Sequence, residues 1–291
     1  MSARGGSVEP ASQPGGEVTS ADGTTIGYAR VGDGPAVVLL HGAGQSAENF
    51  SRLAGELSNA FSVYVPDRRG RGRSPSYGEF RGLHTEVEDL CALLDHCGAE
   101  RVFGLSAGAV IAIETALVRP AISRLALYEP PLSFDGVVHG AWAERYEHAL
   151  DDGRPGAALA TVLKATADRG LLRHLPESLI GGFLDFAIKR TADRPAPPGA
   201  LSPRELIPTL GYDAQTVRDA AGPLERFGGL SCEVLLLGGS RSAPELQASL
   251  DGLAAALPRA KKVVLSGVGH TAADNRGQPT LVAEELRAFF T

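Results

Sequence analysis

The sequence predicts an α/β protein built on a mostly parallel sheet. Short apolar runs rich in β-branched residues alternate with segments of helical periodicity over most of the chain. These runs are nearly continuous in apolar residues, which is typical of parallel strands covered by helices on both faces. Residues 133–226 lack such runs and predict an inserted group of helices. At 291 residues, the chain can hold one large core with a smaller insertion.

The first part of the chain supplies strands and helices in turn. TTIGYARVG (24–32) and AVVLLHG (36–42) predict two strands, because both are rich in β-branched or aliphatic residues. A helix is predicted at 47–59, and FSVYVPD (61–67) predicts the next strand. Helical spacing returns at 84–97, where three leucines lie on one face.

The same alternation continues to the C-terminus. RVFGLS (101–106) predicts a strand, AGAVIAIETALV (107–118) a helix, and RLALYE (124–129) another strand. Helices between successive strands indicate parallel pairing. After the insertion, the predicted elements are strands at 233–239 and 261–267, a helix near 244–256 and a last helix within 278–290.

The insertion is predicted to act as a lid. Helices inserted between two strands usually lie over the strand ends, where open α/β sheets bind their ligands. HGAWAERYEHALDDG carries Trp142 and Tyr146, and LIGGFLDFAIKR carries Phe183 and Phe186. These four aromatic residues are candidates for substrate contact, and packing inside the lid is the alternative. The Pro-rich segment RPAPPGALSP divides the insertion.

The N-terminal residues 1–16 are predicted to form a flexible tail, because their Gly, Ser and Pro content cannot bury enough surface to order the backbone. No apolar stretch follows the first basic residue, so we expect no secretory signal. With residues 133–226 as the lid, residues 17–132 and 227–291 make up the predicted core.

Charge and composition argue against several partners. The net charge of -6 gives no support for nucleic acid or an anionic membrane. No apolar run reaches the roughly 18 residues that span a bilayer. Three cysteines make no disulfide framework, which predicts buried thiols in a reducing cytoplasm. Nothing in the sequence decides the oligomeric state, and a homodimer stays open.

The motif GLSAG (104–108) lies where a predicted strand ends and a helix begins. Glycines on either side leave room for a sharp bend, on which Ser106 projects above the edge of the sheet. The free N–H groups at the start of the following helix point to the same place. We therefore predict that Ser106 is a nucleophile; an idle serine in a glycine-rich turn is the alternative.

A serine nucleophile needs a base within hydrogen-bond reach. His270 follows the last predicted strand, so it emerges at the same end of the sheet as Ser106. His41 ends another strand, but HGAG (41–44) favours a role in holding a loop. In acyl transfer, backbone N–H groups stabilise the negative oxygen of the tetrahedral intermediate. The N–H groups of Ala43 and Ala107 are the natural pair for this oxyanion hole.

Taken together, these motifs resemble the alpha/beta hydrolase fold family. HGAG, DRRGRGRS (67–74), GLSAG, a helical lid and GVGH occur in that family's order over residues 17–291. The resemblance implies an eight-stranded, mostly parallel sheet, a Ser–acid–His triad, no cofactor, and a structural role for DRRGRGRS. It also implies an acyl-enzyme, because relatives that form alkyl-enzyme esters carry Asp in place of Ser106.

The acid of the triad is missing from its usual place. Members of the family usually carry an Asp in the turn after the strand at 233–239, but this chain has GSRSAP there. Glu129, at the end of the strand before the lid, is predicted to replace it, because some lipases of this fold carry the acid after that strand. A hinge residue that binds backbone N–H groups is the alternative role for Glu129. The other candidate acids are Glu245, Asp274 and Asp67.

These features predict a serine hydrolase that cleaves a small apolar ester, thioester or lactone through an acyl-serine intermediate. Two other classes stay open, namely a cofactor-independent lyase on the same scaffold and a ligand-binding protein with a decayed triad. The sequence holds no His-x-x-x-His and no clustered Cys and His at ligand spacing, so no metal is expected. It also lacks a dinucleotide-binding glycine motif after the first strand.

Overall fold

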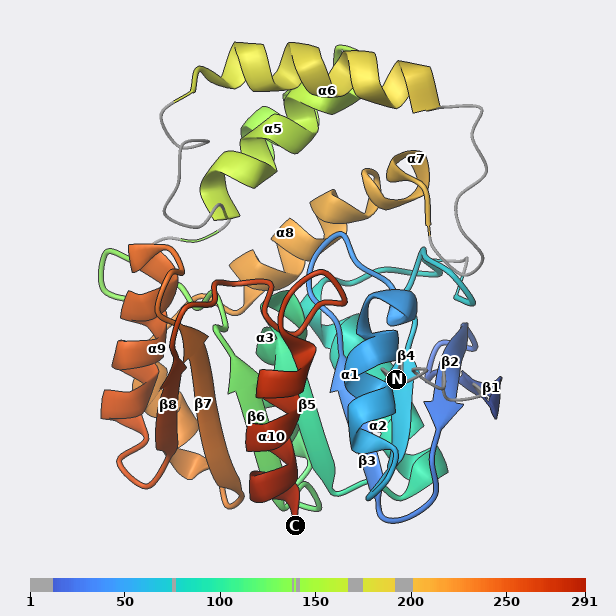
Figure 1. Ribbon diagram of the computed structural model, residues 1–291, viewed down its shortest axis with the longest axis vertical. Coiled ribbons are helices and arrows are strands. Elements are labelled where there is room, and N and C mark those ends of the chain that lie inside the picture. The colour runs from blue at the N-terminus through green and yellow to red at the C-terminus, as the bar shows by residue number, and fades with distance from the viewer. Residues whose placement is uncertain (1–12, 75–76, 138, 140–141, 167–174, 192–200) are drawn as a thin grey trace, which may run out of the picture.

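The computed structural model describes residues 13–74, 77–137, 139, 142–166, 175–191 and 201–291. These residues form an eight-stranded sheet in the order β1-β2-β4-β3-β5-β6-β7-β8. The six strands β4, β3, β5, β6, β7 and β8 pair in parallel. At one edge, β1 pairs antiparallel with β2, and β2 pairs antiparallel with β4. The predicted α/β class with a mostly parallel eight-stranded sheet is confirmed (Figure 1).

The strands and the helices of the core follow the predicted order. The strands are β1 (Gln13–Thr19), β2 (Thr25–Val31), β3 (Ala36–Leu40), β4 (Ser62–Pro66), β5 (Arg101–Leu105), β6 (Arg124–Tyr128), β7 (Glu233–Gly239) and β8 (Lys261–Leu265). The core helices are the 3-10 helix η1 (Ala47–Phe50), α1 (Ser51–Leu57), α2 (Leu83–Cys97), α3 (Ala107–Val118), η3 (Leu224–Gly229), α9 (Pro244–Ala256) and α10 (Pro279–Phe290).

Strand β1 is an element that the sequence did not predict. It overlaps the predicted flexible tail at residues 13–16, so that prediction was wrong there; residues 1–12 lie outside the described residues. The segment QPGGEVT has little intrinsic preference for strand structure. Its pairing partner explains it, because a Cβ added at Gly15 would lie 1.9 Å from the carbonyl oxygen of Tyr28 on β2.

The sheet has a hydrophobic cluster on each face, which explains the continuous apolar strands. Along β3, Val38 and Leu40 belong to the cluster under α2, α3 and α9, whereas Val37 and Leu39 belong to the cluster under α1 and α10. All four side chains are buried. Successive side chains of a strand point to opposite faces, so burial on both faces requires an apolar residue at every position.

The insertion between β6 and β7 forms five α-helices among its described residues. They are α4 (Ala143–Asp151), α5 (Pro155–Thr166), α6 (Glu177–Thr191), α7 (Pro203–Leu206) and α8 (Thr209–Asp219). Helices α5 and α6 lie above the carboxyl ends of the strands, and α8 runs between them and the sheet (Figure 1). Within the Pro-rich segment, residues 194–200 lie outside the described residues.

The insertion has a small core of its own, in which residues such as Tyr146, Ile188 and Leu210 are buried together. Ala43, from the turn after β3, packs against this cluster. The insertion therefore covers that turn directly. None of the helices in the described ranges is both long enough and apolar enough to span a bilayer.

Candidate active site

Ser106 occupies a strained bend between β5 and α3. Its φ of 55° and ψ of -121° lie in a region that L-residues other than glycine rarely adopt. Its neighbours leave no space for side chains: a Cβ at Gly104 would lie 2.4 Å from the carbonyl oxygen of Gly108. A Cβ at Gly108 would lie 2.5 Å from that of Leu40. Both glycines of GLSAG are thus required for close backbone packing.

The ends of β5, β6 and β8 converge beside this bend. The Ser106 N–H donates to the carbonyl of Tyr128 at 2.9 Å, which joins the serine to the end of β6. The Tyr128 hydroxyl in turn donates to the carbonyl of Gly269 at 2.8 Å. Tyr128 therefore connects the serine with the loop that carries His270, although these segments are far apart in the sequence.

Glu129 lies against the histidine. Its Oε2 is 2.7 Å from His270 Nδ1, and its Oε1 accepts the N–H of Gly239 at 2.7 Å. The carboxylate is completely buried, and the His270 side chain is only 10% exposed. Glu129 itself has a φ of 47°, so the backbone turns sharply to direct this side chain toward His270. The structure thus joins the acid predicted from β6 with the predicted base.

The other candidate acids are engaged elsewhere or exposed. Asp274 is buried, and its Oδ2 accepts from Gln45 and Asn49 at 2.8 Å each. Asp67 accepts the N–H of Ala47 at 2.7 Å and also binds Arg73. Glu245 is exposed in the first turn of α9.

The loop after β7, residues 240–243, contains no acid and packs closely on the histidine loop. A Cβ at Gly239 would lie 2.5 Å from the carbonyl oxygen of Val268. The N–H of Arg241 donates to the same carbonyl at 2.9 Å. This loop therefore supports the His270 segment through its backbone.

The turn HGAG follows β3 and faces the start of α3. Gly42 comes close to the nucleophile, since a Cβ there would lie 3.2 Å from Ser106 Cβ. Ala107 is the first residue of α3, and its N–H has no acceptor within the helix. The N–H of Gly42 is bound by Gln45 Oε1 at 2.8 Å. Ala43 thus follows a glycine whose N–H is held by the Gln45 side chain.

His41 orients the peptide that precedes Ala43. Its Nδ1 lies 3.0 Å from the carbonyl oxygen of Gly42, and its Nε2 lies 3.3 Å from the N–H of Arg68. Burial, followed by the charges of Arg71 and Arg68, holds the pKa of His41 well below its ordinary value. The ring is therefore neutral, with Nδ1 as donor and Nε2 as acceptor. Because the peptide is trans, fixing the Gly42 carbonyl also fixes the opposite direction of the Ala43 N–H.

Gln45 and Asp274 tie this turn to the histidine loop. Gln45 Nε2 donates to Asp274 Oδ2, while its Oε1 holds the Gly42 N–H. Gln45 was not among the residues predicted from the sequence, and Asp274 was predicted only as an alternative acid. The position of Gln45 directly after HGAG is the local signal for this bridging role, because a polar side chain next to a buried turn must find hydrogen-bond partners there.

The four aromatic residues of the insertion divide into two pairs. Tyr146 is buried, its hydroxyl donates to the carbonyl of Ile207, and Trp142 packs edge-on against it at 5.6 Å. Phe183 and Phe186 are 70% and 60% exposed on α6. Their exposure argues against the predicted contact of these two phenylalanines with substrate. Helix α6 packs on α5 through its opposite face, where a Cβ at Gly181 would lie 3.0 Å from Ala157.

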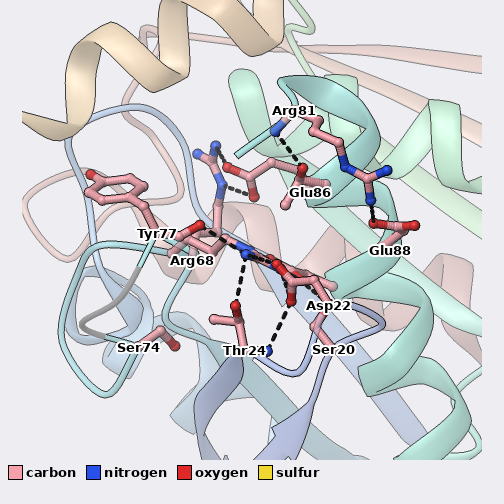
Figure 2. A network of polar contacts seen from close by, with 12 residues as sticks. Ser20, Asp22, Thr24, Arg68, Ser74, Tyr77, Arg81, Glu86 and Glu88 are labelled. Carbon is pink, nitrogen blue, oxygen red and sulfur yellow. Dashed lines mark hydrogen bonds and ion pairs between the residues drawn. The ribbon is translucent and has the colours of Figure 1, made fainter. Parts of the chain in front are cut away.

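The arginine-rich loop after β4 is held in place by carboxylates. This agrees with the structural role predicted for DRRGRGRS. Arg68 binds Glu86 of α2 through Nε at 3.0 Å and Nη2 at 2.5 Å, and Figure 2 shows the two side chains pointing at each other. Arg69 binds Asp89 of α2 and Asp22 in the same way. These three pairs fix the loop against α2 and the turn after β1.

Comparison with known proteins supports the fold. A sequence model described as the alpha/beta hydrolase family matches residues 37–285. The crystal structure of an alpha/beta hydrolase from Sphaerobacter thermophilus is similar with a TM-score of 0.75 and 31% identity, covering 95% of this chain and 100% of that one. The enol-lactonase from Burkholderia xenovorans is similar in fold, with a TM-score of 0.68 and 20% identity over 94% of this chain and 99% of that one.

One of the curated sequences that this chain resembles matches only part of it. The uncharacterized hydrolase YraK of Bacillus subtilis is 30% identical over 135 residues, which make up 45% of this chain. The match spans 49% of that protein, so this chain matches about half the length of its curated relative.

Proposed function

The chain belongs to the alpha/beta hydrolase family, and we propose that it hydrolyses a small apolar carboxylic ester, thioester or lactone through an acyl-enzyme on Ser106. The contact that carries this proposal is the buried 2.7 Å pair of His270 Nδ1 and Glu129 Oε2. A carboxylate on Nδ1 leaves Nε2 as the acceptor nitrogen, which is the tautomer that a general base needs. The serine at the neighbouring bend supplies the nucleophile.

In the first half of the reaction, the Ser106 oxygen attacks the carbonyl carbon while His270 takes the hydroxyl proton. The resulting tetrahedral oxyanion accepts hydrogen bonds from the N–H groups of Ala43 and Ala107. One such donor is typically worth roughly 3–4 kcal/mol of transition-state stabilisation. Collapse of the intermediate breaks the bond to the leaving group, which receives the proton from His270. The acyl group stays on Ser106.

In the second half, water attacks the acyl carbon and gives its proton to His270. A second tetrahedral intermediate forms in the same oxyanion hole. Its collapse breaks the bond to the Ser106 oxygen, which receives the proton from His270, and the carboxylic acid leaves. Glu129 stabilises the imidazolium in both halves and holds the ring by the Nδ1 contact. No proton needs to reach Glu129 itself.

The apolar surroundings of the turn support the substrate class. Ala43 packs against the insertion's cluster, with the partly buried Trp142 and the buried Tyr146 in the same cluster. We propose that these two aromatic residues border the acyl or alcohol group. The crystal structure of an enol-lactonase with the same fold agrees with a lactone or ester as substrate. A cytoplasmic location is part of the proposal, since the three cysteines among the described residues are free thiols.

The proposal is tested by labelling and turnover. A fluorophosphonate probe followed by peptide mass spectrometry is expected to place one adduct on Ser106, and Ser106→Ala is expected to abolish it. A panel of p-nitrophenyl esters of increasing acyl length, with lactones and thioesters, then defines the substrate. Absence of both labelling and turnover in the folded wild-type protein would overturn the proposal and favour ligand binding alone. Proton-transfer chemistry without an acyl adduct would favour a lyase.

A further inference from the structure

Asp213 is a buried acid on helix α8 of the insertion. The buried positions of α8 recur at helical spacing and include Leu210, Ala214 and Val217, and Asp213 lies among them with 1% exposure. A carboxylate on the apolar face of a helix is costly unless it is paired. Its partners should therefore explain why it is there.

The partners of Asp213 come from two loops of the core. Its Oδ2 accepts the N–H of Gly44 at 3.0 Å. Its Oδ1 lies 3.2 Å from Arg71 Nη2 and 2.8 Å from Arg68 Nη1. Both arginine side chains are buried, and Arg68 also binds Glu86. The cluster thus contains two guanidinium groups and two carboxylates, so its charges balance.

Gly44 is the residue that follows Ala43, and its N–H belongs to the next peptide. Three consecutive peptides in the turn are each held by one side chain. Gln45 binds the Gly42 N–H, His41 lies within hydrogen-bond distance of the Gly42 carbonyl, and Asp213 binds the Gly44 N–H. His41 lies in the turn and Gln45 directly follows it, whereas Asp213 comes from the insertion. Gly44 has a φ of 62° and lies against Leu210 of the same helix.

We propose that Asp213 is a positioning residue that completes the oxyanion hole from the insertion. It holds the peptide after Ala43, and together with His41 it sets the direction in which the Ala43 N–H points. The position of α8 against the core thereby determines how well the tetrahedral intermediate is stabilised. This inference rests on the proposed function, because the turn matters in this way only if an acyl intermediate forms.

The charge state of the cluster suits this role. Burial alone raises the pKa of Asp213, but the Arg71 and Arg68 charges and the Gly44 N–H outweigh burial and hold the pKa below its usual value. The carboxylate therefore stays ionised and keeps its acceptor oxygen on Gly44 at neutral pH.

Two variants separate positioning from simple stabilisation. Asp213→Asn keeps the size of the side chain, but its amide N–H₂ faces either the arginines or the Gly44 N–H. The double variant Asp213→Leu with Arg71→Met removes one negative and one positive charge and leaves the Arg68–Glu86 pair intact. Replacing a buried ion pair by apolar residues of similar size is often tolerated, so we expect this variant to fold.

The matched control is Asp89→Asn. Asp89 binds the buried Arg69 of the same loop at 2.6 Å and accepts a hydrogen bond from Ser20, and both partners lie outside residues 41–45. This substitution is expected to lower the melting temperature without lowering kcat. The measurements are kcat and KM on a p-nitrophenyl ester, the Ki of phenylboronic acid, and thermal unfolding of each variant.

A boronic acid forms a tetrahedral adduct with the serine and thus reports on the oxyanion hole. Both Asp213 variants are expected to lose about ten- to thirtyfold in kcat, less than the 10²–10³ loss for complete removal of a donor. The Ki of the boronate is expected to rise by a similar factor, with KM changed less than threefold. Wild-type kcat and Ki in a folded double variant would overturn the inference, as would equal losses in Asp89→Asn. If wild-type protein shows neither turnover nor an adduct on Ser106, the proposed function fails instead.

Discussion

Replacement of Glu129 by glutamine tests the centre of the proposed triad. Glutamine has nearly the same shape, so its amide oxygen can still accept the Gly239 N–H that Oε1 binds at 2.7 Å. The amide N–H₂ then occupies the place of Oε2, 2.7 Å from His270 Nδ1. It donates to Nδ1 and forces the hydrogen onto Nε2. The ring can then no longer accept the proton of Ser106.

The expected loss follows from this reversed tautomer. The same change in a serine protease lowers turnover about 10⁴-fold. We expect Glu129→Gln to lower kcat at least about 10²-fold, which corresponds to about 3 kcal/mol or more in activation free energy. Because the Gly239 contact persists, the free energy of unfolding should change by less than about 1 kcal/mol.

The assay compares the initial rates of p-nitrophenyl ester hydrolysis by wild-type protein, Glu129→Gln and Glu245→Gln, with urea unfolding of each. Glu245→Gln is the matched control, because Glu245 is the exposed acid nearest to the family's usual position. It should retain wild-type kcat. Near-wild-type turnover in a folded Glu129→Gln protein would refute the role of Glu129 and the tautomer argument with it.

Four further predictions follow from the geometry. Ser106→Gly should abolish turnover yet raise the free energy of unfolding by about 1 kcal/mol in urea titrations, because glycine relieves the strain at φ 55°; a loss of stability would contradict this. Gly108→Ala should lower both stability and kcat, since the added Cβ meets two backbone carbonyls within 2.6 Å; an unchanged melting temperature would argue against such close packing. Burial lowers the pKa of His139 to about 4. Between that pH and 6.5 the unfolded chain binds a proton that the folded chain does not, so stability should fall as pH drops through this window, by at most about 3 kcal/mol. His139→Gln should flatten that slope, and an equal slope in both proteins would refute it. Replacing Phe183 and Phe186 by serine should leave kcat/KM for apolar esters unchanged, and a clear loss would return these residues to the binding site.

Much of the core and two residues of the site could be predicted from local sequence. The strand at 101–106 and the helix at 107–118 were recognisable by their apolar residues, and GLSAG between them identified Ser106. The strand β1 could not be recognised, because QPGGEVT owes its conformation to pairing with β2. His270 was recognisable by its place after the last predicted strand.

The choice of acid needed the fold. Glu129 and His270 are 141 residues apart, and the sequence left Glu245 and Asp274 open beside Glu129. The buried contact of Glu129 with His270 Nδ1 favours Glu129 as the acid. Asp274 instead accepts hydrogen bonds from Gln45 and Asn49. Asp213 was missed altogether, although an Asp among apolar residues at helical spacing (Leu210, Ala214 and Val217) is a signal for a buried partner.

What this sequence determines by itself is therefore the alternation of strands and helices and the bend that carries Ser106, since both depend on residues within a few positions of one another. The tertiary structure decides which carboxylate faces His270, which acid holds the turn at Ala43, and that Phe183 and Phe186 face outward. These outcomes depend on which distant segments share a desolvated space, where a buried charge or hydrogen-bond donor must be paired, and such pairing cannot be inferred from spacing along one chain.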